Sequence, residues 1–142
     1  MVGGFAGVLH GSSLVTNDLD ICAVLSPENV ERLRRALADL RPMHRITHQK
    51  LSFLEVPKDD EAILNLYLET DDGILDVLST IAGVGGYERL KASAIEVPLF
   101  GRRCRVIALE DLIRAKEAVG REKDLLAVKE LRAIAAKRGK VV

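Results

Sequence analysis

The strongest constraint on the fold is an Asp-Gly step at residues 71–73, which separates two apolar runs, Ile63–Glu69 and Ile74–Ser79. Asp-Gly between two alternating apolar runs is a strong signal for a β-hairpin, because both residues tolerate the positive φ of a tight turn. We therefore predict two antiparallel strands, with Asp76 in the middle of the second. Aspartate is depleted in strand interiors, so a buried Asp76 requires a partner.

A second acidic feature precedes this hairpin: Asp18 and Asp20 flank Leu19 at the start of an apolar run. If Leu19–Leu25 forms a strand, side chains at i and i+2 share a face, and the two carboxylates lie about 7 Å apart. Like charges at that separation are costly unless a cation lies between them, and Mg²⁺ prefers such oxygen ligands. The alternative, that Asp18 is an ordinary turn residue, does not account for Asp20 inside the strand.

The third feature is the glycine pair Gly3-Gly4, which precedes a short apolar segment, Phe5 to Leu9. We expect this pair to open a helix. Unpaired N–H groups and the positive end of a helix dipole suit the phosphates of a nucleotide. A Gly-Gly pair alone is weak evidence. A small-residue turn, a short helix and an acidic strand in this order form a more specific combination.

In this combination the chain resembles the DNA polymerase β-like nucleotidyltransferase superfamily. Its signature is a hydrophobic residue, Gly-Gly or Gly-Ser, a spacer, and Asp-hydrophobic-Asp-hydrophobic, which correspond here to residues 2–4 and 18–21. The chain is most similar to small bacterial members, related to the minimal nucleotidyltransferases and to abortive-infection toxins of toxin–antitoxin pairs. The likeness extends over residues 3–21, 65–87 and 109–124.

The resemblance implies an α/β (α+β) fold, a mixed β-sheet with helices packed on it, in a single nucleotidyltransferase domain spanning residues 1–142. It implies transfer of a nucleoside monophosphate from an NTP to an acceptor hydroxyl with two Mg²⁺ ions. Asp18 and Asp20 would bind both ions, and Asp76 would be the third catalytic carboxylate and metal ligand. The alternative for Asp76 is a structural role, bonded to a turn amide or paired with an arginine.

Other predicted contacts concern the triphosphate. By resemblance, Gly3 and Gly4 receive the phosphates, and the Ser12 hydroxyl contacts them, although residues 10–13 also fit a plain polar turn. Lys116 and Arg121 lie beside a helix break at Gly120 and would hold the triphosphate or the acceptor. The alternative for them is a solvated helix face, with Asp124 as a first-turn residue that the helix dipole favours.

The beginning of the chain departs from the family pattern. Relatives carry a helix and most of a strand before the glycine pair, whereas this chain starts at Met1-Val2. The domain is therefore expected to be truncated before the glycine turn, with a sheet edge for a homodimer or antitoxin partner to cover. The loop at residues 14–17 also lacks the basic residue of many relatives.

Composition limits the partners. The 21 Lys and Arg balance the 21 Asp and Glu, so an RNA contact would require a local patch. A membrane-spanning run and the basic region of a signal peptide are both missing, which favours a cytoplasmic protein without membrane contact. The acceptor, whether tRNA, a protein or a small molecule, is not determined. An alternative function is a catalytically silent binding module that acts through a partner chain.

The remaining segments predict ordinary elements. Helices are expected at 28–40, with Ser26 as N-cap, and at 110–136, with the break at Gly120. Further strands are expected at Ile46–Val56, Ile95–Phe100 and Arg103–Ile107. Cys22 and Cys104 fit buried free thiols, and a zinc site at His44 and His48 is not expected.

Overall fold

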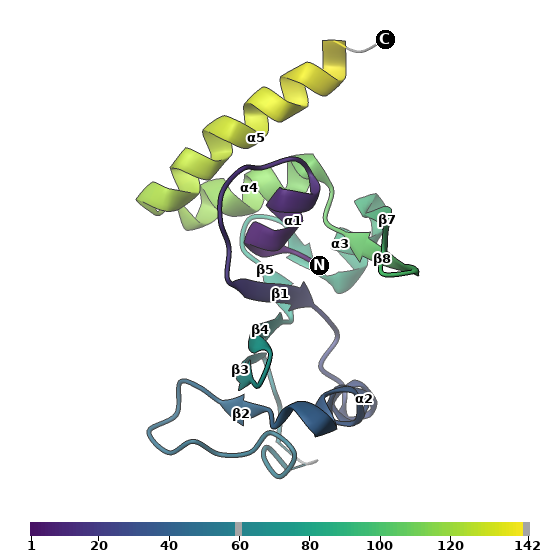
Figure 1. Cartoon of the computed structure of the whole chain (residues 1–142), viewed down its shortest axis with the longest axis vertical. Helices are drawn as coiled ribbons and strands as arrows, with labels where there is room; N and C mark the ends of the chain where they lie inside the picture. The colour runs from purple at the N-terminus through teal and green to yellow at the C-terminus, as the bar shows by residue number, and fades with distance from the viewer. Residues whose placement is uncertain (59–60, 141–142) are drawn as a thin grey trace.

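The computed structural model describes residues 1–58 and 61–140. Within them the chain forms helices, a mixed sheet and two small antiparallel pairs, arranged as in Figure 1. The helices are α1 (Gly3–Leu9), α2 (Pro27–Leu37), the 3-10 turn η1 (Ala38–Leu40), α3 (Tyr87–Ser93), α4 (Leu109–Val119) and α5 (Glu122–Lys140). The strands are β1 (Asp18–Cys22), β2 (Met43–His44), β3 (Asn65–Thr70), β4 (Gly73–Leu78), β5 (Thr80–Ile81), β6 (Gly85–Gly86), β7 (Ile95–Leu99) and β8 (Arg102–Val106).

The main sheet has the strand order β1-β4-β3-β2. β1 runs parallel to β4, and the other two pairs are antiparallel. The predicted hairpin is confirmed: Thr70 pairs with Gly73 across the two-residue turn, and Asp76 lies mid-strand. The predicted α+β class, with helices packed on a mixed sheet, is also confirmed. β1 ends at Cys22 rather than at Leu25, because its partner β4 ends at Leu78.

Helix α2 covers one face of this sheet. It begins as predicted, since the Ser26 hydroxyl accepts a hydrogen bond from the Asn29 amide at 3.3 Å and Pro27 occupies the first turn. Val30 of α2 packs with buried residues of β3 and β4 around the fully buried Phe53. The regular helix stops at Leu37, and the chain turns away at Arg41, which has φ 49°.

The strand predicted at Ile46–Val56 is wrong. Only Met43 and His44 form β2, and Met43 makes an isolated bridge with Ser52. Phe53 leaves the extended path to fill the space under α2, and its backbone finds other partners: its carbonyl accepts from Arg34 Nε at 2.8 Å. Burial of one large side chain therefore decides this segment over alternation of apolar residues.

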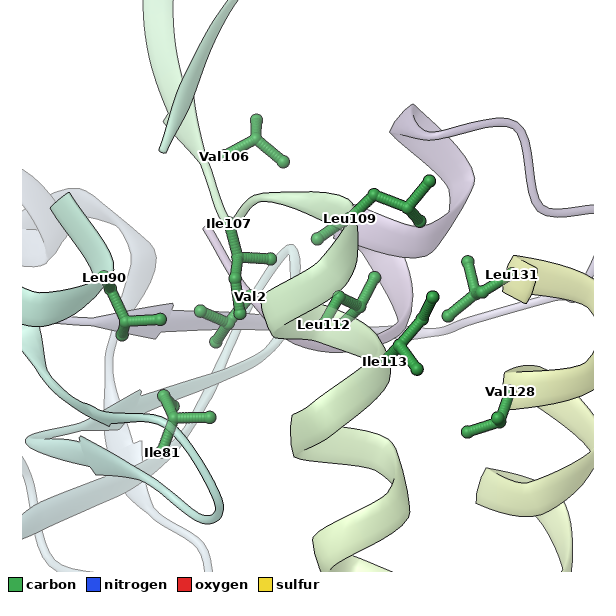
Figure 2. Packing of buried hydrophobic residues seen from close by; sticks show 11 residues of the cluster. Val2, Ile81, Leu90, Val106, Ile107, Leu109, Leu112, Ile113, Val128 and Leu131 are labelled. Carbon is green, nitrogen blue, oxygen red and sulfur yellow. The ribbon is translucent and has the colours of Figure 1, made fainter. Parts of the chain in front are cut away.

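A second and larger core joins α1, α3, α4 and α5. Figure 2 shows Leu112 and Ile113 of α4 pointing toward Val128 and Leu131 of α5. The helical path is interrupted between α4 and α5 at Gly120, whose φ of 69° gives the left-handed C-cap that the sequence predicts. This core fixes the α4–α5 corner and the first turn of α1 against β1.

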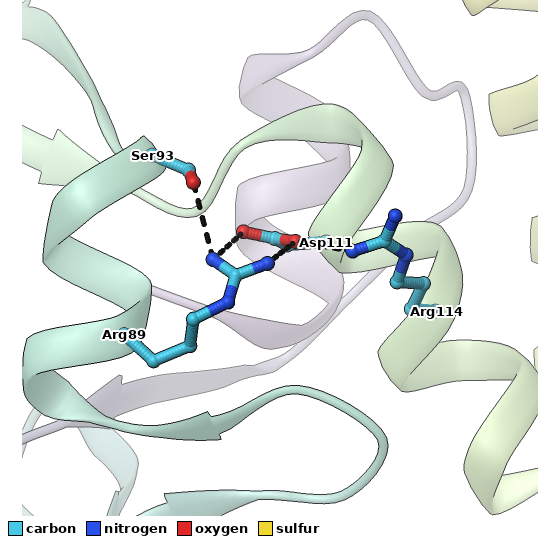
Figure 3. Close-up of polar contacts among 4 residues, drawn as sticks. All are labelled: Arg89, Ser93, Asp111 and Arg114. Atoms are coloured by element: carbon cyan, nitrogen blue, oxygen red, sulfur yellow. Dashed lines mark hydrogen bonds and ion pairs between the residues drawn. The ribbon is translucent and has the colours of Figure 1, made fainter.

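A buried carboxylate connects α3 to α4. Asp111 accepts hydrogen bonds from Arg89 at 2.9 and 3.1 Å, and Arg89 also donates to Ser93 at 3.1 Å (Figure 3). Arg114 contacts the same carboxylate at 3.5 Å from the next turn of α4. A first-turn acid is ordinary in helices, so the sequence pattern did not single out Asp111.

The first two residues lie between β1 and the end of β8. The Val2 amide donates to the Asp20 carbonyl at 2.9 Å, and the Met1 carbonyl accepts from the Ile107 amide at 3.0 Å. We expected the β1 edge to be open, but the backbone of Val2 pairs with it at Asp20. Closure of this edge by a second chain stays a prediction. No helix in the described residues is long and apolar enough to span a bilayer.

Candidate active site

Three aspartates meet on one face of the sheet. In the parallel pair of β1 and β4, Asp20 is the register partner of Asp76, and Asp18 is the partner of Ile74. Laterally paired residues project from the same face, and so do residues two apart on one strand. Asp18, Asp20 and Asp76 accordingly line one cavity of about 470 Å³.

The electrostatics of Asp20 reflect this crowding. Its pKa is raised above the ordinary aspartate value, first by burial and then by the negative charges of Asp76 and Asp18. The positive charges of Lys116 and Arg45 offset part of this effect. The three carboxylates are therefore close enough to repel one another, as the sequence predicts for Asp18 and Asp20.

The glycine pair has a steric role beside Asp20. Gly3 has φ 70°, and a Cβ at this position would lie 2.2 Å from Asp20 Oδ2. A Cβ at Gly4 would lie 2.9 Å from the hydroxyl of Thr16 in the following loop. Gly3 thus leaves room for the carboxylate, and Gly4 lines the cavity. Phosphate binding at both glycines stays a prediction.

The partner of Asp76 is an arginine that the sequence analysis did not single out. Arg45 Nη2 lies 2.6 Å from Asp76 Oδ2, and its Nε lies 3.2 Å from Oδ1, which makes a bidentate pair. The guanidinium carbon lies 5.5 Å from the ring centroid of Tyr67. Pairing with an arginine was one of the alternatives for Asp76, and the structure shows that pair.

Arg45, Tyr67, Asp76 and Asp20 form a transverse row across the sheet. The Arg45 amide donates to the Tyr67 carbonyl at 3.1 Å, Tyr67 is the register partner of Asp76, and Asp76 is that of Asp20. Side chains in one such row share a face. The row becomes visible only when the strand order is known, so a search for local motifs misses Arg45.

Lys116 and Arg121 also line the cavity, and their binding of a triphosphate stays a prediction. Both contact Asp124, whose side chain is 2% exposed: Lys116 Nζ lies at 3.6 Å and Arg121 Nε at 2.7 Å. Lys116 is itself only 20% exposed, so a simple solvated face does not describe it. Arg121 lies at the rim.

Asp124 is more than a first-turn residue. Burial alone would raise its pKa, but hydrogen bonds from Arg121 and the charges of Arg121 and Lys116 outweigh burial and hold the pKa below the ordinary value. The backbone amide of Arg121 also donates to this carboxylate at 3.2 Å. Asp124 therefore orients the two cations on the cavity wall.

The loop after α1 is bound to α5. The hydroxyls of Ser12 and Ser13 both donate to the carboxylate of Glu130. The buried His10 ring donates from Nε2 to the Ile107 carbonyl at 2.7 Å, because a carbonyl only accepts, and its Nδ1 accepts from Arg138 at 3.1 Å. These contacts are those of a polar turn, which was the alternative to phosphate binding for residues 10–13. Ser12 also lines the cavity, and its contact with phosphate stays a prediction.

The donor chemistry around Asp20 fits a hard cation in part. Carboxylate oxygens are the ligands that Mg²⁺ prefers, and Asp18 and Asp20 present them to the cavity. In the described part of the chain, however, no three His, Cys, Asp or Glu side chains form a ready-made metal cluster. Both oxygens of Asp76 accept from Arg45, so Asp76 fits the metal only after that pair opens.

The other candidate ligands have separate positions. Cys22 in β1 and Cys104 in β8 are free thiols, as predicted, but they are only partly buried. The Nε2 of His44 lies 2.8 Å from the Val56 carbonyl and the ring packs edge-on against Phe53, which gives this histidine a structural role.

Comparison with family models and with curated proteins adds no relative. The chain matches no family model, and no curated protein matches it significantly. The resemblance to nucleotidyltransferases therefore rests on the sequence motifs alone.

Proposed function

We propose that this protein is a Mg²⁺-dependent nucleotidyltransferase, which transfers a nucleoside monophosphate from an NTP to an acceptor hydroxyl. The observation that carries the proposal is the register of Asp20 with Asp76, which brings two carboxylates from distant parts of the chain onto one face. Asp18 adds a third, and Lys116 and Arg121 supply positive charge to the same cavity.

Each group has a chemical role in this reaction. When bound, two Mg²⁺ ions supply charge neutralisation and polarise the phosphate oxygens, and Asp18, Asp20 and Asp76 would hold them. Lys116 and Arg121 orient the triphosphate, with Gly3, Gly4 and Ser12 as further donors to its oxygens.

The proposed step is an in-line displacement. The acceptor oxygen forms a bond to the α-phosphorus, while the bond from that phosphorus to the bridging oxygen breaks and pyrophosphate leaves. The hydroxyl proton passes to Asp76, the carboxylate nearest the acceptor in this proposal.

The biological setting is part of the proposal. A tRNA end, a protein hydroxyl and a small molecule are all chemically competent acceptors, because the carboxylate chemistry is the same for each. The resemblance to abortive-infection toxins favours a cytoplasmic toxin, with an antitoxin or a second copy of the chain as partner.

A catalytically silent binding module is the second candidate. The observation that favours it is the Arg45–Asp76 pair, in which the side chains are 26% and 13% exposed. A cation already in place reduces the repulsion that would otherwise demand a metal. In this alternative the carboxylates and Arg45 form a stable polar centre, and the protein acts through a partner.

The two candidates differ in ligand binding. A nucleotidyltransferase should melt at a higher temperature with Mg²⁺ and an NTP, because a ligand that binds only the folded state stabilises it. Incubation with α-³²P-labelled NTPs, cell RNA and cell protein should then label an acceptor, whereas Asp20→Asn should not. If none of the four NTPs raises the melting temperature or labels an acceptor, the enzyme is excluded and the silent module remains.

A further inference from the structure

Arg45 is the one basic residue of the described cavity lining that contacts an aspartate of the sheet face. It enters from the sheet edge opposite β1, directly after β2. Its fork spans both oxygens of Asp76, and its guanidinium carbon lies over the ring of Tyr67. The Arg45 guanidinium therefore occupies both carboxylate oxygens through which Asp76 would bind a metal ion.

Other arginine–aspartate pairs of the protein provide a contrast. Arg89 pairs with Asp111, which is 4% exposed and lies outside the cavity, so that pair can only connect helices. Arg41 pairs with Asp71 at the surface, where both side chains are open to water. Arg121 also forks onto Asp124 in the wall of the cavity, but that carboxylate belongs to α5. Among the described residues, only the Arg45 pair places such a fork on a buried carboxylate of the sheet face.

We propose that Arg45 is a built-in counter-cation, which holds Asp76 until metal-bound nucleotide arrives and then transfers its hydrogen bonds to the triphosphate. This inference rests on the proposed function. Mg²⁺ and the guanidinium compete for the same two oxygens, so the metal alone binds weakly. A guanidinium released from a carboxylate finds an equivalent bidentate acceptor in a phosphate group.

The exchange has a thermodynamic consequence. The nucleotide phosphate accepts the hydrogen bonds that Arg45 loses when it leaves Asp76. Metal and nucleotide therefore bind cooperatively, and each raises the affinity for the other by the same factor. Removal of the guanidinium should therefore strengthen binding of the metal alone and weaken binding of the metal-bound nucleotide. A purely structural pair predicts no gain in metal affinity when it is broken.

The test compares Arg45→Met, which keeps an apolar stem, with Arg45→Lys, which keeps the charge but not the fork. Arg41→Met, in the surface pair with Asp71, is the matched control. Calorimetric titration with MgCl₂ alone should show affinity about tenfold tighter for Arg45→Met than for the wild type, and an intermediate value for Arg45→Lys. With saturating Mg²⁺, the affinity of Arg45→Met for the NTP should fall about tenfold.

The possible results distinguish a failure of the inference from a failure of the proposed function. Unchanged or weaker Mg²⁺ binding by both Arg45 variants, in a wild type that binds Mg²⁺ and NTP, overturns the inference and leaves the nucleotidyltransferase proposal intact. Metal binding that appears only in the variants supports the inference. If no folded form binds Mg²⁺ or NTP, both proposals fail. Should Arg45→Met not fold, the Arg45→Lys titration decides, because that variant retains the charge beside Asp76.

Discussion

Asp20 and Asp76 are register partners on the parallel strands β1 and β4, so two distant acidic positions meet on one face of the sheet. Their proximity, with Asp18 on the same face, raises the pKa of Asp20 beyond the effect of burial. A fold that places ionised carboxylates near one another is less stable at neutral pH than it would be without their repulsion, which is a common feature of functional sites. Mutations around this pair therefore test function and stability separately.

Asp20→Asn should leave the protein without bound metal at least as stable as the wild type at pH 7, because it removes a charge whose raised pKa makes ionisation unfavourable in the fold. The same variant should lose the rise in melting temperature that Mg²⁺ and NTP produce. Thermal melts with and without the ligands measure both effects. Asp72→Asn, in the exposed hairpin turn, is the control; a large loss of stability in Asp20→Asn would identify Asp20 as a structural residue.

Gly3→Ala should destabilise the protein and displace the Asp20 carboxylate, since the new Cβ would lie 2.2 Å from Asp20 Oδ2. Gly101→Ala isolates the cost of the left-handed backbone, because it has φ 76° and no neighbour within 4 Å of the new Cβ. We expect about 1 kcal/mol of lost stability for Gly101→Ala and a larger loss for Gly3→Ala in urea unfolding. Equal losses would contradict the steric role of Gly3.

Asp124 should make stability depend on acid pH. Its pKa is lowered from the ordinary 3.8 in the fold, so its contribution is fully present above that value and is lost as the pH falls through the lower folded pKa. Urea unfolding from neutral to acid pH should therefore show the wild type losing its advantage over Asp124→Asn as the pH drops below 3.8. Glu122→Gln, an exposed change in the same turn, should show no such convergence. A constant difference between wild type and Asp124→Asn would rule out the ionic role.

Asp111→Ala should cost about 1–2 kcal/mol of stability, because it removes a buried carboxylate that accepts from Arg89, whose side chain is itself 42% exposed and can be solvated. Asp71→Ala breaks the exposed pair with Arg41 and should change the unfolding free energy little. Chemical denaturation compares the two. Since Asp111 lies outside the cavity, folded Asp111→Ala protein should keep wild-type affinity for Mg²⁺ and NTP, and a selective loss of that affinity would show that Asp111 belongs to the site.

Local patterns were enough for much of the framework. Turn chemistry predicted the hairpin at residues 71–73 and the corner at Gly120, and capping chemistry predicted the start of α2 at Ser26. Acids inside apolar strand patterns also made Asp20 and Asp76 stand out, and the resemblance to nucleotidyltransferases grouped them with Asp18. Such signals depend on neighbours within a few residues, and these interactions exist before the chain is folded.

Only the tertiary structure decided which distant groups meet. The strand order places Arg45 in one row with Asp76 and Asp20, and burial of Phe53 replaces the predicted strand at 46–56 with turns. Asp124 became a buried anchor only through the α4–α5 corner. Sequence by itself determined the hairpin, the start of α2, the α4–α5 corner and the acidic positions, since these follow from local sterics and hydrogen bonding. Pairing of charges across strands and helices depends on the packing of the whole chain, which no local pattern encodes.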